Sequence, residues 1–374
     1  MKRVVSFGAT MPLSALLVLP NSIYALQNLF SPPKLPSFPG LISGGNTPAP
    51  LQKRIQLGTL SVSPMGLGTL NLPINKEIDD ETTQVLKTAS ELGINFADTA
   101  EAYGFGKSET MTRNCLRDAN LEVGDNGMNI ATKFAPVPWR PDGSSVVEAC
   151  KASAERLGVE KIPLYQIHWP DIIQPFKSFG YENRKDELFW DGLAECYLSG
   201  LVENVGVSNY GPETLLRASD ALSKRGVPIT SNQINLSLAR YRSSEATLKI
   251  CDELGIKVLA YFPLANGLLA GKYSVETPPS WPKSITMKKY YEGTAPILNA
   301  LKDIAEKRQK TVPQVAINWT MMKGAIPIPG ARNVDMARDN FGAMGWALTE
   351  DEVFQLEAAS AASEEFSNGG FELV

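Results

Sequence analysis

Residues 96–109 read FADTAEAYGFGKSE, and the rest of the fold can be worked out from this stretch. The apolar residues 94–97 predict a short strand that ends at Asp98, and Tyr103 follows in a turn that leads into a helix. A free tyrosine has a pKa of about 10, and a nearby ammonium lowers that pKa. A carboxylate would hold such an ammonium in place. The stretch therefore predicts a lysine partner, and a histidine, from elsewhere in the chain.

Beyond this stretch, from about residue 53 onward, amphipathic helices that end at a glycine alternate with short apolar strands. Asp79 and Asp80 open one such helix before Gly93, and Ser243 and Ser244 open another before Gly255. The expected strands are continuous apolar runs, which is typical of parallel strands that are buried on both faces. They lie at residues 65–68, 95–98, 128–133, 164–168, 202–208, 229–233, 257–261 and 325–328.

This alternation predicts the fold class α/β, as a closed (β/α)8 TIM barrel. A β-hairpin from residues 54–57 and 60–62 is expected to cap the floor of the barrel. The alternative is an open doubly-wound sheet, but its Gly-rich nucleotide fingerprint is missing. Residues 66–71 (GLGTLN) have Asn in place of the third glycine, and residues 267–273 (GLLAGKY) are one residue short of a phosphate loop.

Polar or aromatic side chains end the expected strands from the second onward. In a barrel these ends meet at one face, where active sites are built. Any one of them alone is better explained as a solvated loop residue or a cap, but their recurrence at one end predicts a site. They are Asp98, Lys133, His168, Ser208, Asn209, Gln233 and Tyr261, followed by the turn at residues 329–332.

Composition argues against several other classes of function. The 374 residues carry a formal net charge of −4, which gives no reason to expect nucleic acid or an anionic membrane as a partner. His168 is the only histidine, which argues against a zinc or iron site built on two imidazoles. The four cysteines are far apart in the sequence, so neither a disulfide framework nor a thiolate metal site is indicated.

Residues 1–50 differ from the remainder, and we set them apart from the barrel domain at 51–374. Lys2 and Arg3 precede an apolar run at 13–19, as in a secretory signal, and no acidic residue occurs before Glu77. Acid-poor, Ser-rich composition is typical of transit peptides. A signal followed by a transit-like segment predicts a plastid (chloroplast) protein that enters through the secretory route. The alternatives are a secreted protein and a cytoplasmic one whose leader carries no address.

Six motifs in order resemble the aldo-keto reductases over about residues 60–356. The motifs are DTAEAYG at 98–104, ATKF at 131–134, QIHWP at 166–170, VGVSNY at 205–210, SNQ at 231–233 and IPIPGARN at 326–333. The resemblance implies a barrel that binds NADPH without a Rossmann fold and reduces a small-molecule carbonyl substrate. It implies a catalytic tetrad of Asp98, Tyr103, Lys133 and His168.

The same resemblance implies a row of cofactor-binding residues. They are Ser208, Asn209 and Gln233 for the nicotinamide amide, Tyr261 for the ring face, Pro263, Leu264, Ala265 and Lys272 for the pyrophosphate, and Gly330, Arg332, Asp339 and Asn340 for the adenosine end. In this scheme Tyr103 donates a proton to the carbonyl oxygen, Lys133 lowers the pKa of the phenol, Asp98 anchors Lys133, and His168 orients the substrate. Arg332 would select NADPH by pairing with its 2′-phosphate.

Further segments resemble the plant plastid branch of the family, among them FAPVPWR at 134–140 and TVPQVAINW at 311–319. By this resemblance, pyridoxal is the first substrate to expect. Simple aldehydes from lipids or sugars are the next. Two rival functions stay open at this point. One is a nucleotide-binding accessory subunit like the β subunits of potassium channels, and the other is a different barrel enzyme, such as an isomerase or aldolase.

Overall fold

The structure is a computed structural model that describes residues 54–70, 72, 79–124, 127–172, 184–271 and 290–364. The leader at 1–50 and Lys272 lie outside these residues. The strands are β1 (Ile55–Leu57), β2 (Leu60–Val62), β3 (Leu67–Gly68), β4 (Phe96–Asp98), β5 (Asn129–Phe134), β6 (Ile162–Ile167), β7 (Val202–Ser208), β8 (Ile229–Asn235), β9 (Lys257–Tyr261) and β10 (Ile326–Pro327).

The helices alternate with these strands. They are α2 (Asp80–Glu91), α3 (Lys107–Asp118), α4 (Ser144–Leu157), α5 (Asp186–Leu198), α6 (Pro212–Ser223), η2 (Leu238–Arg240), α7 (Tyr241–Glu253), η3 (Ala265–Ala270), α9 (Ala295–Arg308), α10 (Val312–Met322), α11 (Val334–Phe341) and α12 (Glu350–Ala361).

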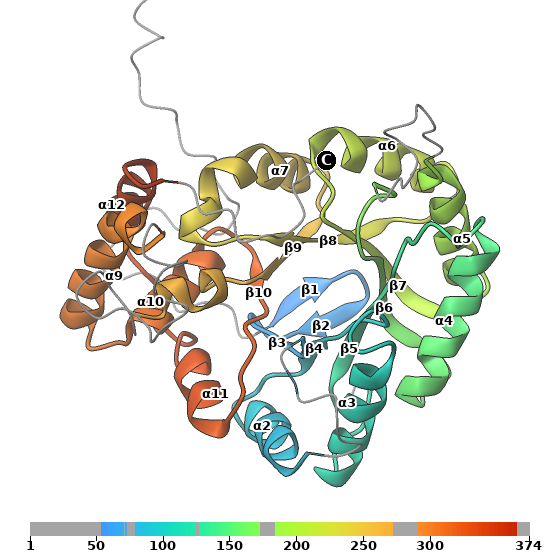
Figure 1. Cartoon of the computed structure of the whole chain (residues 1–374), viewed down its shortest axis with the longest axis horizontal. Helices are drawn as coiled ribbons and strands as arrows, with labels where there is room; N and C mark the ends of the chain where they lie inside the picture. The colour runs from blue at the N-terminus through green and yellow to red at the C-terminus, as the bar shows by residue number, and fades with distance from the viewer. Residues whose placement is uncertain are drawn as a thin grey trace, which may run out of the picture. The chain divides into compact units, whose positions relative to one another are not determined.

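The strands β3 to β10 form one parallel sheet of eight strands in chain order. The sheet closes on itself where the amides of Gly66 and Gly68 donate to the carbonyls of Pro327 (2.9 Å) and Pro329 (3.1 Å). In Figure 1 the strands surround the centre of the molecule and the helices lie outside them. The predicted (β/α)8 barrel with an N-terminal hairpin is confirmed.

The hairpin of β1 and β2 covers the end of the barrel at which the strands begin. Leu57, Leu60 and Val62 pack against Phe96 and Leu164 inside the strand ring. The amide of Thr59 also donates to the side chain of Asn204, near the start of β7 (2.8 Å). The opposite end, where the strands terminate, is therefore the one left for a site.

Local sequence explains some helix boundaries. The carboxylate of Asp79 accepts from the amide of Thr82 at 2.9 Å, so α2 begins where its N-cap predicts. The helix expected to open at Ser243 and Ser244 begins earlier, at Tyr241. The Ser244 hydroxyl donates back to the carbonyl of Arg240 (3.1 Å), as serines inside helices do, instead of capping an N-terminus. Within the described ranges, no helix combines the length and apolar character needed to cross a membrane.

Candidate active site

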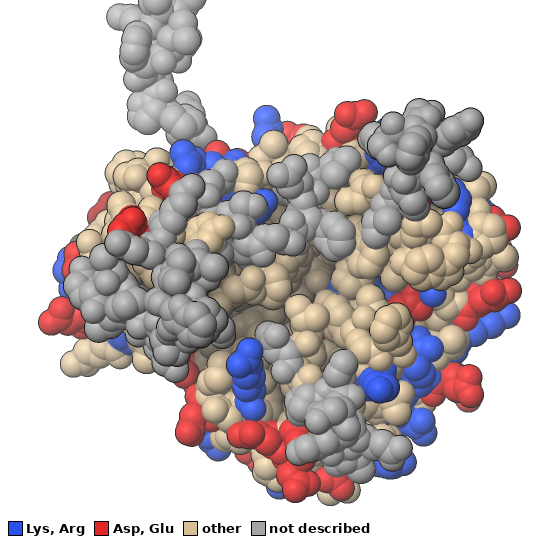
Figure 2. Space-filling view, in the orientation of Figure 1, with Lys and Arg blue, Asp and Glu red and all other residues tan. Residues whose placement is uncertain are grey.

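Three neighbouring strands bring the central side chains to the mouth of the barrel. Asp98 is the last residue of β4, Lys133 lies near the end of β5, and His168 directly follows β6. Because these strands are parallel neighbours, their carboxyl ends lie side by side. Figure 2 shows a hollow over the centre of the strand ring, with mostly uncharged side chains around it.

Asp98 and Lys133 form a buried ion pair. The Nζ of Lys133 lies 2.5 Å from Oδ1 of Asp98, and it also donates to the carbonyl of Thr99 (2.8 Å). The Lys133 side chain is fully buried and that of Asp98 is 3% exposed. A buried charge without a partner is costly, so each of the two residues requires the other.

Tyr103 and His168 complete the cluster above this pair. The Tyr103 hydroxyl is 3.5 Å from Nζ of Lys133, and its ring meets the His168 ring edge to face with centroids 5.6 Å apart. The Nδ1 atom of His168 is buried and has no hydrogen-bond partner among the described residues. The structure thus brings Asp98, Tyr103, Lys133 and His168 together.

Burial decides the charge of Tyr103 and of His168. It raises the pKa of Tyr103 well above its ordinary value, and the Asp98 carboxylate acts in the same direction. It lowers the pKa of His168 well below its ordinary value, and the Lys133 ammonium adds to that effect. The phenol is therefore protonated and the imidazole neutral near pH 7. The pKa of the phenol is therefore raised overall by desolvation and Asp98, and a lowering contribution from Lys133 stays a prediction.

The ion pair itself is opposed by burial and maintained by mutual attraction. Desolvation raises the pKa of Asp98, while Lys133 and the amides of Gln233 and Gln166 lower it. Desolvation lowers the pKa of Lys133, and Asp98 counteracts that shift. Oδ2 of Asp98 accepts from Nε2 of Gln233 at 2.8 Å and from Nε2 of Gln166 at 3.4 Å.

A second group of predicted residues lines the adjacent strand ends. The Ser208 hydroxyl donates to the carbonyl of Gln233 (2.9 Å), and the Tyr261 hydroxyl donates to Oδ1 of Asn209 (2.8 Å). Nδ2 of Asn209 donates to the carbonyl of His168 (2.9 Å), so this group is linked directly to the cluster around Tyr103. Asn209 has a φ of 63°, a left-handed conformation that Asn tolerates well. Amides and a phenol in this row suit a planar ligand that carries a carboxamide.

The remaining predicted cofactor residues follow β9 and β10. Pro263, Leu264 and Ala265 lead from β9 into the turn η3, while Gly330 and the exposed Arg332 lie between β10 and α11.

Two predicted adenosine contacts on α11 are engaged within the protein. Nδ2 of Asn340 donates to the carbonyl of Gly330 (3.3 Å). Oδ1 of Asp339 accepts from the Thr311 hydroxyl (2.8 Å), so the Asp339 side chain holds α11 to the start of α10.

One contact that the sequence did not predict holds the turn of Tyr103 in place. The Glu101 carboxylate accepts from both guanidinium nitrogens of Arg140, at 2.5 and 3.0 Å, and from the amide of Ala135 at 2.7 Å. This bidentate pair joins the turn after β4 to the loop after β5. Glu101 lies within the motif around Tyr103, but nothing in its sequence position indicated the partner.

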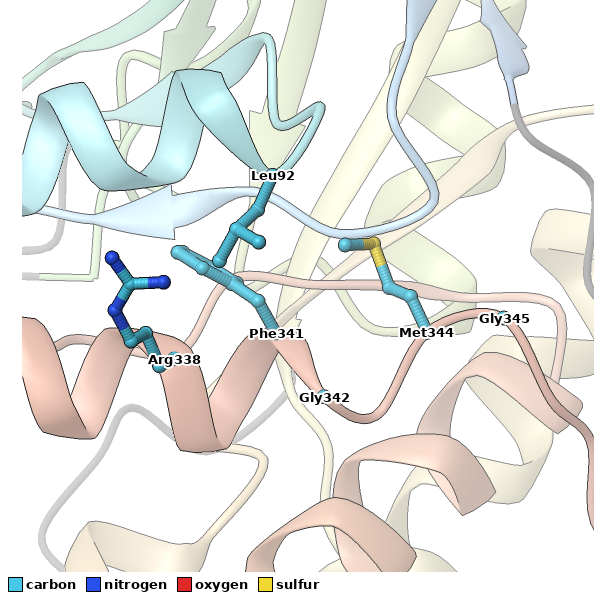
Figure 3. A pocket seen from close by; sticks show the side chains of 6 residues that line it. All are labelled: Leu92, Arg338, Phe341, Gly342, Met344 and Gly345. Atoms are coloured by element: carbon cyan, nitrogen blue, oxygen red, sulfur yellow. The ribbon is translucent and has the colours of Figure 1, made fainter.

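Other features offer no comparable chemistry. The four cysteines are buried and free, and the described residues contain no group of three or more side chains that could hold a metal ion. A surface pocket of about 360 Å³ lies where α2 and α11 end, away from the strand ends. Figure 3 shows that Leu92, Phe341 and Met344 line it, with Arg338 at one side.

Comparison with known proteins agrees with this arrangement. The chain matches the model of the aldo/keto reductase family over residues 64–361. It is 42% identical over 346 residues to a chloroplastic pyridoxal reductase of Arabidopsis thaliana, covering 89% of this chain and 90% of that protein. It is 31% identical over 323 residues to a probable aldo-keto reductase of Glycine max, covering 81% and 87%.

Among solved structures, a glycerol dehydrogenase from Gluconobacter oxydans superimposes with a TM-score of 0.69 at 25% identity, covering 85% of this chain and 98% of that one. These matches extend over the whole barrel. This chain belongs to the aldo/keto reductase family of oxidoreductases, which act on small carbonyl compounds with a nicotinamide cofactor.

Proposed function

We propose that this protein reduces an aldehyde or ketone to an alcohol with NADPH, with Tyr103 as the proton donor. The observation that supports this most directly is the position of the Tyr103 hydroxyl, 3.5 Å from the buried Lys133 nitrogen and beside the His168 ring. A protonated phenol at the mouth of the barrel is the form that a proton donor needs. Its neighbours are the groups that can stabilise the phenolate left behind.

The residues divide the work of the reaction. When bound, the nicotinamide supplies the hydride that attacks the carbonyl carbon. Tyr103 gives its proton to the carbonyl oxygen as negative charge develops there. Lys133 stabilises the resulting phenolate electrostatically, and Asp98 keeps Lys133 charged. His168 stays neutral and directs one ring N–H to the substrate oxygen.

The residues around the mouth fit a nicotinamide cofactor. Ser208, Asn209 and Gln233 carry hydroxyl and amide groups that can bind the carboxamide. Tyr261, at the end of the adjacent strand β9, is the predicted contact of the ring face. We assign NADPH rather than NADH because Arg332 is exposed beside Gly330, where a guanidinium can pair with a phosphate on the ribose. Pro263 to Ala265 and Lys272 remain the predicted pyrophosphate segment.

Pyridoxal is the substrate we propose first. The support is the 42% identity to a protein named as a chloroplastic pyridoxal reductase, over nearly the full length of both chains. The same similarity and the acid-poor leader support a plastid location, with residues 1–50 as the targeting segment and 51–374 as the catalytic domain.

A turnover screen tests this function. The purified protein is mixed with NADPH and pyridoxal, or with short aliphatic and sugar aldehydes, and the loss of NADPH absorbance is followed. We expect turnover with NADPH, slower turnover with NADH, and the highest kcat/KM for pyridoxal. Tight NADPH binding without oxidation by any carbonyl would favour the accessory-subunit function. Failure to bind NADPH would exclude the whole proposal.

A further inference from the structure

Gln166 lies in the middle of the buried polar network beneath the ion pair. It belongs to β6, between Tyr165 and Ile167, and its side chain is fully buried. Its Nε2 atom donates to Oδ2 of Asp98 (3.4 Å), and its Oε1 atom accepts from the hydroxyl of Ser231 (3.2 Å). An amide in the core of an apolar strand is costly unless both ends are satisfied, and here both ends are.

The neighbouring residues determine which way this amide faces. Because the Asp98 carboxylate can only accept, the nitrogen of Gln166 must face it, and the oxygen of Gln166 then accepts from the Ser231 hydroxyl. Gly206 leaves the room that this arrangement needs. A Cβ atom at position 206 would lie 2.1 Å from Oγ of Ser231 and 3.1 Å from Cγ of Gln166.

The two oxygens of Asp98 therefore have different partners. Oδ1 faces the Lys133 ammonium, while Oδ2 receives the amides of Gln233 and Gln166. Gln233 is also an expected nicotinamide ligand. Gln166 has both of its polar atoms committed inside the protein and is expected to touch neither cofactor nor substrate.

We propose that Gln166 is a positioning residue for the reduction, which holds the Asp98 carboxylate so that Lys133 stays charged beneath Tyr103. This inference rests on the proposed function. The charged and titratable groups around the pair are Tyr103 from the turn after β4, His168 from the end of β6, and Glu109 from α3, whose carboxylate acts on Lys133.

Loss of the Gln166 amide would remove a donor from a buried carboxylate. The pKa of Asp98 would rise, because a hydrogen bond to the charged form favours that form. A proton would then shift more readily from Lys133 to Asp98, which leaves two neutral groups and removes the cation that stabilises the phenolate. As the pH falls, Asp98 would also take up a proton from solvent earlier than in the wild type and would no longer hold Lys133, so activity would fall at the acidic end of the pH range first.

The test uses Gln166→Met, which preserves side-chain volume and removes both polar atoms. We expect kcat to fall about tenfold or more, on the scale of a hydrogen bond to a charged group. We expect the acidic limb of the kcat profile to move upward by about one pH unit, with an unchanged KM for NADPH. Ser231→Ala removes the hydroxyl that holds the oxygen of Gln166. It should shift the acidic limb of the kcat profile in the same direction by a smaller amount. This variant replaces Gln166→Met in the test if Gln166→Met does not fold.

Asn204→Ala is the matched control, since Asn204 is a buried amide on β7 that binds the hairpin and not Asp98. It should lower stability without moving the pH profile. The inference would be overturned if Gln166→Met had the wild-type pH profile of kcat. It would also be overturned if kcat were reduced but the acidic limb of the profile did not move, as in the control.

A carboxyl-carbon NMR titration of Asp98 measures the same shift without turnover. If the wild-type protein reduces no carbonyl, the proposed function is wrong, yet a higher Asp98 pKa in Gln166→Met would still support the contact. An unchanged Asp98 pKa would refute it independently of activity.

Discussion

The buried pair of Asp98 and Lys133 should lose more stability when one partner is removed than when both are. The pair is 2.5 Å apart and its side chains are 3% and 0% exposed, so neither charge can be solvated in place. Removing one partner of such a pair costs about 3–5 kcal/mol. Asp98→Asn and Lys133→Met each preserve shape, and each should cost this amount at pH 7. The double variant should lose less than either single variant, so its loss should fall short of the sum of the two by at least about 3–5 kcal/mol.

The two single variants should also respond to pH in opposite directions. In Asp98→Asn, burial lowers the pKa of Lys133 with no carboxylate to oppose it. Between that pKa and the unfolded value of about 10.4, the unfolded chain holds more protons, so stability rises with pH. In Lys133→Met, burial raises the pKa of Asp98 with no ammonium to oppose it. Above the unfolded value of about 3.9, the folded chain holds more protons, so stability falls as pH rises.

Urea unfolding followed by tryptophan fluorescence measures these losses, provided that the slopes of the transitions agree among the variants. Lys249→Met offers a surface control, because its ion pair with Glu253 is exposed and 3.8 Å long and should contribute little. Additive losses in the double variant, or parallel pH slopes in the two single variants, would show that the two groups are not a coupled buried pair.

Three other outcomes follow from the site. Tyr103→Phe should lower kcat by roughly two to four orders of magnitude, which is the scale of general acid catalysis. NADPH binding, measured by fluorescence, should be unchanged. Full turnover in this variant would contradict the assignment of Tyr103 as the proton donor. Arg332→Ala should weaken the binding of NADPH by about tenfold or more and that of NADH very little. Equal losses of affinity for the two cofactors in binding titrations would count against a phosphate contact. His168→Gln should lower kcat without removing any ionisation between about pH 6 and 7, because burial already keeps the imidazole neutral. An inflection in that range for the wild-type enzyme that is absent from the variant would oppose this explanation.

Much of the barrel could be predicted from the chain because its strands are apolar runs between clear turn signals. The strands at Val202–Ser208 and Lys257–Tyr261 have the predicted bounds, and a glycine precedes each of them closely. Strands β3 and β10 have only two residues each, fewer than predicted. There the ring closes through amides of Gly66 and Gly68 to proline carbonyls, a pairing between distant segments that no local pattern encodes.

The candidate site shows the same division between local and distant information. The positions of Asp98 and Lys133 followed from strand ends, which sequence periodicity reveals. The direction of the Tyr103 pKa shift could not be predicted in this way, because it depends on how far the folded chain desolvates the phenol and on how close Asp98 lies to it. The role of Gln166 depends on Ser231 and Gly206, which lie on other strands and become neighbours only when the ring closes.

The charge states at the mouth favour reduction over oxidation near neutral pH. Reduction needs a protonated phenol and an uncharged hydrogen-bond donor, and burial provides both at Tyr103 and His168. Oxidation of an alcohol needs the phenolate as a base, and the adjacent Asp98 carboxylate makes that form harder to reach. The Lys133 ammonium would stabilise that phenolate, yet the pKa of the phenol is raised overall. The resting site therefore holds the proton that reduction uses, whereas oxidation of an alcohol must first remove that proton from Tyr103.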